Sequence, residues 1–357
     1  MKNDTAVSRR LALEAPIIQG PFGGGLSAVD LVVAVSESGG LGSFGVHHLD
    51  GAGIRDVAGR IRARTARPFA LNLWIPLRDS DDPQLSDAQW QTALGLLEPY
   101  FRQMGRELPQ RPVRFAPPYE EQVETVLELA PAVFSFVFGI PSASVLDRCR
   151  SAGILTLGAA TTPAEAKLLA DAGVDMIVAT GFEAGGHRVS FLREAETCLT
   201  GTLSLVPQVA DTVKVPVIAA GGIVDARGVA AAMKLGAAAA QIGTAFLACE
   251  ESNAAPLHRE ALFSPAARRT SLTRAFSGRL ARSIHNEFVD AFAGREHLLP
   301  PYPVQNWLTA QFRAAALAAG RTDMVSLWSG QSAPMLRHRK AAQLMSALKA
   351  DLGAMKR

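Results

Sequence analysis

The chain alternates short apolar runs with longer alanine-rich runs, and this alternation restricts its possible folds more than any other feature. The runs that predict β-strands are residues 16–20, 41–45, 69–74, 132–139, 154–160, 176–181, 215–222 and 239–246. Several of them are apolar throughout, which is typical of parallel strands covered on both faces. Helices are predicted between them, for example over 28–38, 164–172 and 227–235, and glycine follows in sequences such as DAGVD and KLGAA, where a left-handed helix cap is needed.

These eight strand–helix units predict an α/β fold, a (β/α)8 TIM barrel. An open doubly wound sheet has the same alternation, but GPFGGG follows the first strand in place of GxGxxG. Residues 76–118 interrupt the third unit as an insertion with a helix over 87–104, and long insertions of this kind form lids or walls. The resulting prediction is a barrel over 1–252, followed over 253–357 by a C-terminal helical extension or flap, including SLTRAFSGRLAR, packed on the barrel mouth.

Composition excludes several classes of protein. Of the 357 residues, 48% are hydrophobic, which excludes a disordered chain, and 36 basic against 33 acidic residues leave no basic tract for nucleic acid. Cys149, Cys198 and Cys249 stand far apart without ligand spacing, so we expect no metal site or disulfide framework. The chain lacks a signal peptide and an apolar run of about 18 residues, so a cytoplasmic protein without a membrane partner is expected. Its oligomeric state is left open.

The last two predicted strands end in glycine-rich sequences. Gly221 and Gly222 end the seventh strand, while Gly243 and Thr244 stand in the eighth. In such barrels the active site lies at the C-terminal strand ends, and the loops after strands seven and eight commonly bind phosphate. Either pair alone could make a tight turn, but two consecutive units favour a phosphate site.

The sequence EAGGH follows the sixth strand. Gly185 and Gly186 would let the backbone approach a flat ligand, and His187 could exchange a proton near neutral pH. A single histidine on a loop is more often exposed to solvent, but its place after a barrel strand favours a functional role. Glu183 could orient this histidine or form a salt bridge with Arg188.

Three amides fall inside apolar strands, and each has two interpretations. Asn72, Gln19 and Gln241 could be satisfied core amides or could form hydrogen bonds with a cofactor ring. His47 and His48 form a tandem pair of which at most one could face a pocket, and solvent is the simpler expectation for both.

Together these residues resemble the nitronate monooxygenase family, formerly called 2-nitropropane dioxygenases. The resemblance spans about residues 16–331 and is carried by PIIQGPFGGG, ESGGLGSFG, ALNLW, GFEAGGHR, VPVIAAGGI and QIGTAF. SGRLARSIHNEF, PYPVQNWLTA and SLWSGQ are similar to its bacterial class I branch. The resemblance implies non-covalent FMN, with family contacts at Asn72, Gly185, Gly222, Gln241, Ile242, Gly243 and Thr244 and a catalytic His187. Our full set of expected FMN-binding residues adds Gln19, Gly20, Thr180, Gly186 and Gly221.

The activity that this resemblance implies is the oxidation of alkyl nitronates by O2 to a carbonyl compound and nitrite. His187 would then bind the anion, or act as a base where a neutral nitroalkane is accepted. Thr180 stands where the family usually has glutamine, and Val137 where class I members often have histidine, which makes the pocket more apolar. One alternative is an FMN-dependent NAD(P)H reductase of quinones or enoyl thioesters, a group that shares EAGGH but usually lacks the SLWSGQ region. Another is a flavin-binding barrel without turnover.

Overall fold

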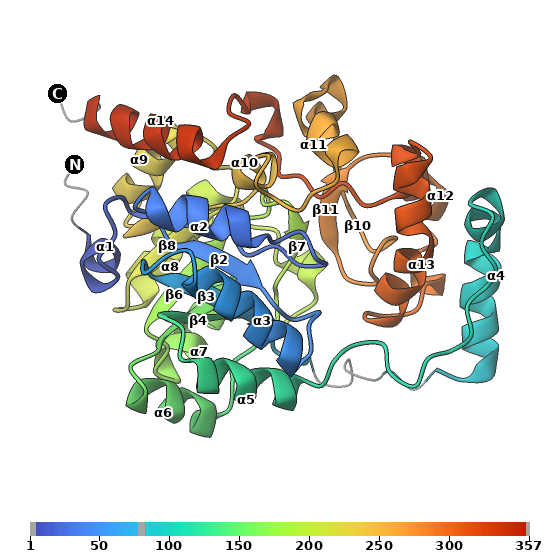
Figure 1. The fold of residues 1–357 in the computed structure, drawn as a ribbon, viewed down its shortest axis with the longest axis horizontal. Coiled ribbons are helices and arrows are strands. Elements are labelled where there is room, and N and C mark those ends of the chain that lie inside the picture. The colour runs from blue at the N-terminus through green and yellow to red at the C-terminus, as the bar shows by residue number, and fades with distance from the viewer. Residues whose placement is uncertain (1–4, 78–82, 84, 355–357) are drawn as a thin grey trace.

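Eight parallel strands close into a barrel in the computed structural model, which describes residues 5–77, 83 and 85–354 (Figure 1). The barrel strands are β1 (Ile17–Gln19), β2 (Gly42–Gly45), β3 (Phe69–Trp74), β4 (Val133–Val137), β5 (Leu155–Ala160), β6 (Met176–Thr180), β8 (Val217–Ala220) and β9 (Ala239–Ile242). Neighbours pair in the order β1-β9-β8-β6-β5-β4-β3-β2, and a parallel bridge from Ile18 to Leu41 closes the ring. The predicted (β/α)8 barrel is confirmed, and the open sheet is excluded.

Helices surround this barrel. They are α2 (Val29–Glu37), α3 (Gly51–Arg62), α5 (Tyr119–Leu129), α6 (Ala143–Ser151), α7 (Pro163–Asp171), α8 (Thr202–Thr212), α9 (Ala226–Lys234) and α10 (Thr244–Leu247). The helices expected over 28–38, 164–172 and 227–235 are therefore present as α2, α7 and α9. After α7 and α9 the chain turns through Gly173 (φ +86°) and Gly236 (φ +100°), which satisfies the last helical carbonyls before the next strand begins.

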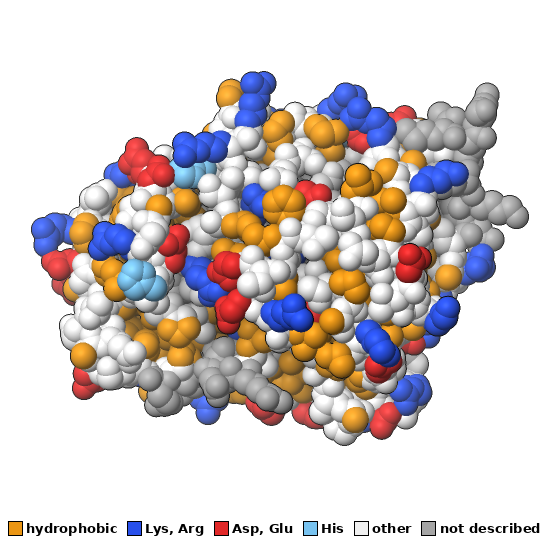
Figure 2. Space-filling view, turned by 180° about the vertical axis from the view of Figure 1, so that it is seen from behind, with side chains coloured by type: hydrophobic (Ala, Val, Ile, Leu, Met, Phe, Trp, Pro, Cys, Tyr) orange, Lys and Arg blue, Asp and Glu red, His pale blue; other side chains and the backbone are white. Residues whose placement is uncertain are grey.

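The two chain ends lie on the same side of the barrel. The short helix α1 (Ala6–Arg10) and the terminal helix α14 (Ala341–Ala354) are both at the left of the molecule in Figure 1. Helix α14 packs against α9 and α2 and so completes the outer ring. No helix among the described residues is both long and apolar enough to cross a bilayer. On the face shown in Figure 2, charged side chains of both signs are scattered among apolar ones.

The insertion after β3 contains the predicted helix, here α4 (Asp87–Gln103), which begins with a capping box between Ser86 and Gln89. Its apolar face buries Trp90 and Phe101 in the hydrophobic cluster shared with α13 (Val304–Ala318). In Figure 1 this helix lies beyond α13, at the edge of the molecule farthest from α14. Within the described part of the insertion, it is residues 115–117 that reach the barrel mouth.

The segment SLTRAFSGRLAR is not helical, and its prediction was wrong. It forms β10 (Thr270–Thr273) and β11 (Ala281–Ile284), an antiparallel hairpin to which β7 (Gly186–His187) adds a third strand. Pairing with β7 is a contact across about 95 residues of sequence, and such tertiary pairing overrides local helical preference. Helices α11 (Pro256–Phe263), α12 (Glu287–Phe292) and α13 pack around this small sheet, as Figure 1 shows.

Candidate active site

A cavity of about 290 Å³ lies at the C-terminal ends of the barrel strands. The predicted residues that line it are Gly20, Asn72, Thr180, Gly185, Gly186, His187, Gly221, Gly222, Gln241, Gly243 and Thr244. Two predicted residues, Gln19 and Ile242, do not line it, because both side chains are fully buried in the protein. The Oε1 atom of Gln19 accepts a hydrogen bond from Ser43 N, and its Nε2 donates to Gly20 O, so Gln19 is a satisfied core amide.

His187 is held in a strand, not on a free loop. It pairs with Ala281 across the small sheet, and its Nε2 lies 2.8 Å from the Ser277 hydroxyl. The ring centroids of Trp74 and Trp328 lie 4.9 and 5.2 Å from that of the imidazole. Burial in this apolar surrounding, together with the nearby positive charges of Arg279 and Arg313, lowers the pKa of His187 to about 3. The imidazole is therefore neutral at physiological pH.

Two arginines bring positive charge to the cavity. Arg313, from α13, lines it, and its guanidinium makes no hydrogen bond or ion pair with the described part of the chain. Desolvation lowers the pKa of Arg313, although it stays charged at neutral pH. Arg279 lies 4.4 Å above the ring of Phe138 and 4.3 Å above that of Tyr302, within cation–π range. Sequence reasoning singled out neither residue.

His47 and His48 both line the cavity, contrary to the expectation that at most one could face it. His47 is only 8% exposed and stacks on Trp74 with ring centroids 3.9 Å apart. Its pKa is lowered well below the ordinary value by burial and by the neighbouring His48. Trp74 ends β3 at the cavity and supplies an apolar surface for both His47 and His187. This tryptophan at a strand end is the sequence feature that could have indicated a buried place for these histidines.

The glycine-rich strand ends expose backbone donors to the cavity. Gly221 (φ +105°) and Gly222 (φ +71°) take a left-handed backbone that only glycine adopts easily. A Cβ atom on Gly243 would meet no atom within 4 Å, so the backbone there faces open space. The amide N–H groups of Gly222, Gly243 and Thr244 donate no hydrogen bond within the described residues. Three unpaired N–H groups beside a cavity form a set of donors suited to an anion.

The EAGGH loop is arranged differently from the prediction. A Cβ on Gly185 would lie 2.6 Å from Gly330 N, so this glycine permits packing against the C-terminal segment. Glu183 neither orients His187 nor pairs with Arg188, and both of its oxygens accept from Thr202 N at the start of α8. The guanidinium of Arg188, 2% exposed, donates instead to carbonyl oxygens of Thr180, Gly181 and Cys198. Both residues therefore shape the loop that carries His187.

The remaining polar side chains lie along the same wall. Asn72 donates from Nδ2 to Ser135 Oγ at 3.0 Å, and the Thr244 hydroxyl accepts from Gly330 N at 2.9 Å. Val137 also lines the cavity, at the position where the family resemblance places a histidine. No group of three histidine, cysteine, aspartate or glutamate side chains that could hold a metal occurs in the described ranges.

A second cavity of about 440 Å³ adjoins the first. The two share His47, Trp74 and Tyr302, and the ring centroids of Trp74 and Tyr302 lie 5.1 Å apart. Arg279 and Arg114 line this outer cavity. Aromatic side chains thus stand between the outer cavity and the one that holds His187.

Comparison with known proteins agrees with this geometry. The family model described as nitronate monooxygenase matches residues 5–351. A Staphylococcus aureus (strain Newman) protein named "Probable nitronate monooxygenase" is 38% identical over 347 residues, 97% of this chain and 96% of the relative. A nitroalkane oxidase from Streptomyces ansochromogenes has a solved structure that matches with a TM-score of 0.89 at 36% identity, covering 99% of both chains.

More distant structures share the fold. FabK from Thermotoga maritima matches with a TM-score of 0.76 at 26% identity, over 99% of this chain and 97% of its own. The match over nearly the whole length, at 38% identity with the relative from Staphylococcus aureus, decides the family. This chain belongs to the nitronate monooxygenase family and is an oxidoreductase.

Proposed function

We propose that this enzyme uses FMN to oxidise alkyl nitronates with O2 to a carbonyl compound and nitrite. Two nitronate anions and one O2 contain the atoms, charge and electrons of two carbonyl compounds and two nitrite ions, so the reaction needs no further reductant. The observation that carries the proposal is the neutral imidazole of His187 in a cavity that also holds unpaired backbone N–H donors and an unpaired guanidinium.

The residues present fit FMN. The N–H groups of Gly222, Gly243 and Thr244 would hold the phosphate, and the Thr244 hydroxyl, which accepts from Gly330, retains its proton to donate. The polar side chains of Asn72, Thr180 and Gln241 line the cavity and would form hydrogen bonds with the flavin ring. Gly20, Gly185, Gly186 and Gly221 complete the proposed set. Bound FMN supplies the redox chemistry that amino-acid side chains lack.

The protein itself supplies charge and proton transfer. Because His187 is neutral, the positive charge that attracts an anionic nitronate comes from Arg313 and Arg279. The apolar rings of Trp74 and Trp328 exclude water from the imidazole and strengthen these electrostatic interactions. Where a neutral nitroalkane binds, the uncharged imidazole is in the correct state to accept its α-proton.

The first experiment is an absorption spectrum of the purified protein, before and after anaerobic addition of NADH and then NADPH. Oxidised-flavin bands that persist with both nucleotides, together with nitrite release from ethyl or 2-propyl nitronate, would support the proposal. Rapid bleaching by a nucleotide without nitrite release would replace it with the reductase. A colourless protein that cannot be reconstituted with FMN would overturn the cofactor assignment.

A further inference from the structure

We propose that His47 is a substrate-binding residue whose Nε2–H donates a hydrogen bond to an oxygen of the nitro or nitronate group. The inference rests on the proposed function and deepens it, because it adds a second imidazole to the residues that contact the substrate. It is carried by the place of His47 between two cavities and by the different surroundings of its two ring nitrogens.

His47 lies where the outer cavity meets the inner one, the cavity that holds His187. It lines both of them, as does Trp74. The glycines whose N–H groups are proposed to hold the phosphate, Gly222 and Gly243, line the inner cavity but not the outer one. A ligand that extends from one cavity into the other touches the His47 side chain, so we assign this imidazole to the substrate and not to the phosphate.

The backbone on either side of His47 is fixed by a strand and a helix. Val46 N donates to Asn72 O in β3 at 2.9 Å. From α5, the buried Nε2 of Gln122 donates to His47 O at 2.9 Å and to Leu49 O at 2.7 Å. The imidazole therefore starts from a backbone whose position is defined before any ligand binds.

The ring of His47 is held by contacts with Trp74 and Gly23. It stacks on the indole with an angle of 10° between the two planes. A Cβ atom on Gly23 would lie 2.7 Å from Cε1 and 3.3 Å from Nε2 of the imidazole. This close approach gives one glycine of the GPFGGG sequence a packing role, because a side chain at position 23 would displace the histidine ring.

The two nitrogens of this ring have different surroundings. Nδ1 of His47 is buried and has no hydrogen-bond partner within the described residues. Nε2 lies on the ring edge beside Gly23, a residue that lines the inner cavity, and it makes no hydrogen bond with the described part of the chain. A buried N–H without an acceptor is rarer than a buried acceptor without a donor. The single proton of the neutral ring therefore belongs on Nε2, where a ligand can accept from it.

The groups around His47 keep its imidazole neutral. Burial lowers the pKa of His47 well below its ordinary value, and the neighbouring His48 acts in the same direction. His187 and Arg279 add to this lowering. A neutral N–H binds an anionic oxygen without giving up its proton, so the ring suits the binding of a nitronate.

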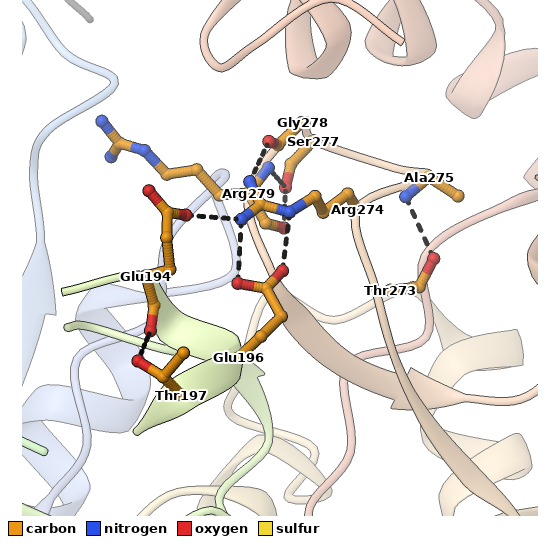
Figure 3. A network of polar contacts seen from close by, with 9 residues as sticks. All are labelled: Glu194, Glu196, Thr197, Thr273, Arg274, Ala275, Ser277, Gly278 and Arg279. Carbon is orange, nitrogen blue, oxygen red and sulfur yellow. Dashed lines mark hydrogen bonds and ion pairs between the residues drawn. The ribbon is translucent and has the colours of Figure 1, made fainter. Parts of the chain in front are cut away.

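The turn that carries Arg279 is held by the network in Figure 3. Arg274 forms two hydrogen bonds with Glu196, at 2.8 and 3.0 Å, and one with Glu194 at 3.3 Å. Its Nη1 also donates to Gly278 O at 3.3 Å. The paired geometry of an arginine with a carboxylate fixes orientation as well as distance. The backbone from which Arg279 reaches the two imidazoles is therefore fixed by the fold.

The test begins with a readout that does not depend on turnover. The probe is sodium nitrite, whose anion has two oxygens on one nitrogen, as the nitro group has. Purified holoenzyme labelled with ¹⁵N-histidine is titrated with it and followed by long-range ¹H–¹⁵N NMR, and the His47 signals are assigned by their loss in His47→Gln. We expect an Nε2–H tautomer whose Nε2 signal shifts as nitrite is added. An Nδ1–H tautomer, or His47 signals that do not respond to nitrite, would overturn the proposal even if no variant folds.

Kinetics with ethyl nitronate then tests the contact with substrate. His47→Phe keeps a ring to stack on Trp74 but removes the donor, so KM should rise on the order of tenfold while flavin content stays constant, because a hydrogen bond to a charged oxygen is lost. His47→Gln can donate from an amide nitrogen near the former Nε2 and should recover most of this loss. Equal losses in the two variants would contradict a role as donor.

The control is His297→Phe, which makes the same change at an exposed position. It should alter neither KM nor flavin content. Loss of flavin in His47→Phe alone would show that this imidazole binds the cofactor, and the assignment to the substrate would fail. If the wild type releases nitrite from no nitronate, the proposed function fails, while the NMR titration still decides whether His47 binds an oxygen of this kind.

Discussion

The ends of β8 and β9 and the C-terminal region contribute different kinds of groups to the same cavity. The ends of β8 and β9 supply glycines and backbone N–H donors, at Gly222 and Gly243 for example. The region after residue 252 supplies charged and aromatic side chains, among them Arg313, Tyr302 and Trp328. A backbone site suits the invariant phosphate of a cofactor, whereas side chains suit a substrate that differs between enzymes. This difference predicts that substitutions at the ends of β8 and β9 abolish cofactor binding and that those in the C-terminal region change catalysis or substrate preference.

The largest effect is expected for Gly243→Val, which tests the barrel half of this comparison. Its backbone (φ −98°) accepts a side chain, and the space beyond the Cα is open, so the protein should fold. The isopropyl group would occupy the space proposed for the phosphate, and purified protein should contain less than about a tenth of the wild-type flavin. The control is Gly59→Val, on the exposed face of α3. A fully yellow Gly243→Val protein would refute the placement.

His187 lies where the two regions meet, and His187→Asn should separate cofactor binding from turnover. The variant should retain FMN, because no proposed phosphate donor is altered. Nitrite release from a neutral nitroalkane should fall about 10²–10⁴-fold, the usual contribution of a general base. Measuring flavin content and turnover on the same preparation makes the two effects independent. Unchanged turnover would remove His187 from the mechanism.

The sequence predicts a region well where the interactions that form it join residues close together in the chain. Barrel strands and helices are specified by local apolar runs and glycine caps, so their places, and the glycines at Gly221, Gly222 and Gly243, could be predicted. The small sheet could not, because β11 pairs with the two residues of β7 far away in sequence.

The side chains of the site divide in the same way. His187 follows a recognisable strand, whereas Ser277 becomes significant only when folding brings its hydroxyl to Nε2. For Gln19 the strand was predicted correctly, but the contact with the cofactor was not. Hydrogen bonds with Gly20 and Ser43 direct its amide into the core. The sequence alone does not indicate whether such a side chain points into the cavity or into the core.

Stability should depend on pH through a buried histidine of the C-terminal region. His258 is 3% exposed, its Nε2 lies 3.0 Å from Trp328 O, and burial lowers its pKa to about 4. Above pH 6.5 neither the folded nor the unfolded chain protonates it. As pH falls from 6.5 toward 4, the unfolded chain takes up a proton that the folded chain does not, so folding becomes less favourable.

The size of this effect follows from the shift in pKa. At about 1.4 kcal/mol per pH unit, His258 should cost about 3 kcal/mol of unfolding free energy between pH 6.5 and 4. Urea unfolding of His258→Gln, which can still donate to Trp328 O, should show a shallower loss than the wild type. His297→Gln, at an exposed position, should lose unfolding free energy with falling pH as steeply as the wild type. If the His258 variant lost it equally steeply, the inference that a neutral imidazole is buried at position 258 would be wrong.

The smallest effect is expected for Arg313→Met, which tests the C-terminal half of the comparison. Methionine keeps most of the apolar stem but removes the positive charge from the cavity wall. A charge-assisted hydrogen bond contributes about 1.5–3 kcal/mol, so KM for a preformed nitronate should rise about tenfold or more while flavin content stays constant. Removing that charge should also raise the pKa of His187, because Arg313 is one cause of its lowering.

The control for Arg313→Met is Arg60→Met, which removes a charge from the exposed face of α3. It should alter neither KM nor flavin content. Loss of flavin in Arg313→Met would show that the C-terminal region binds the cofactor as well, and the division between a backbone site for FMN and a side-chain site for substrate would then fail. A rise in KM that vanishes at high salt in both proteins would instead indicate general attraction of the anion, since distant charges are screened over about 10 Å at 0.1 M salt.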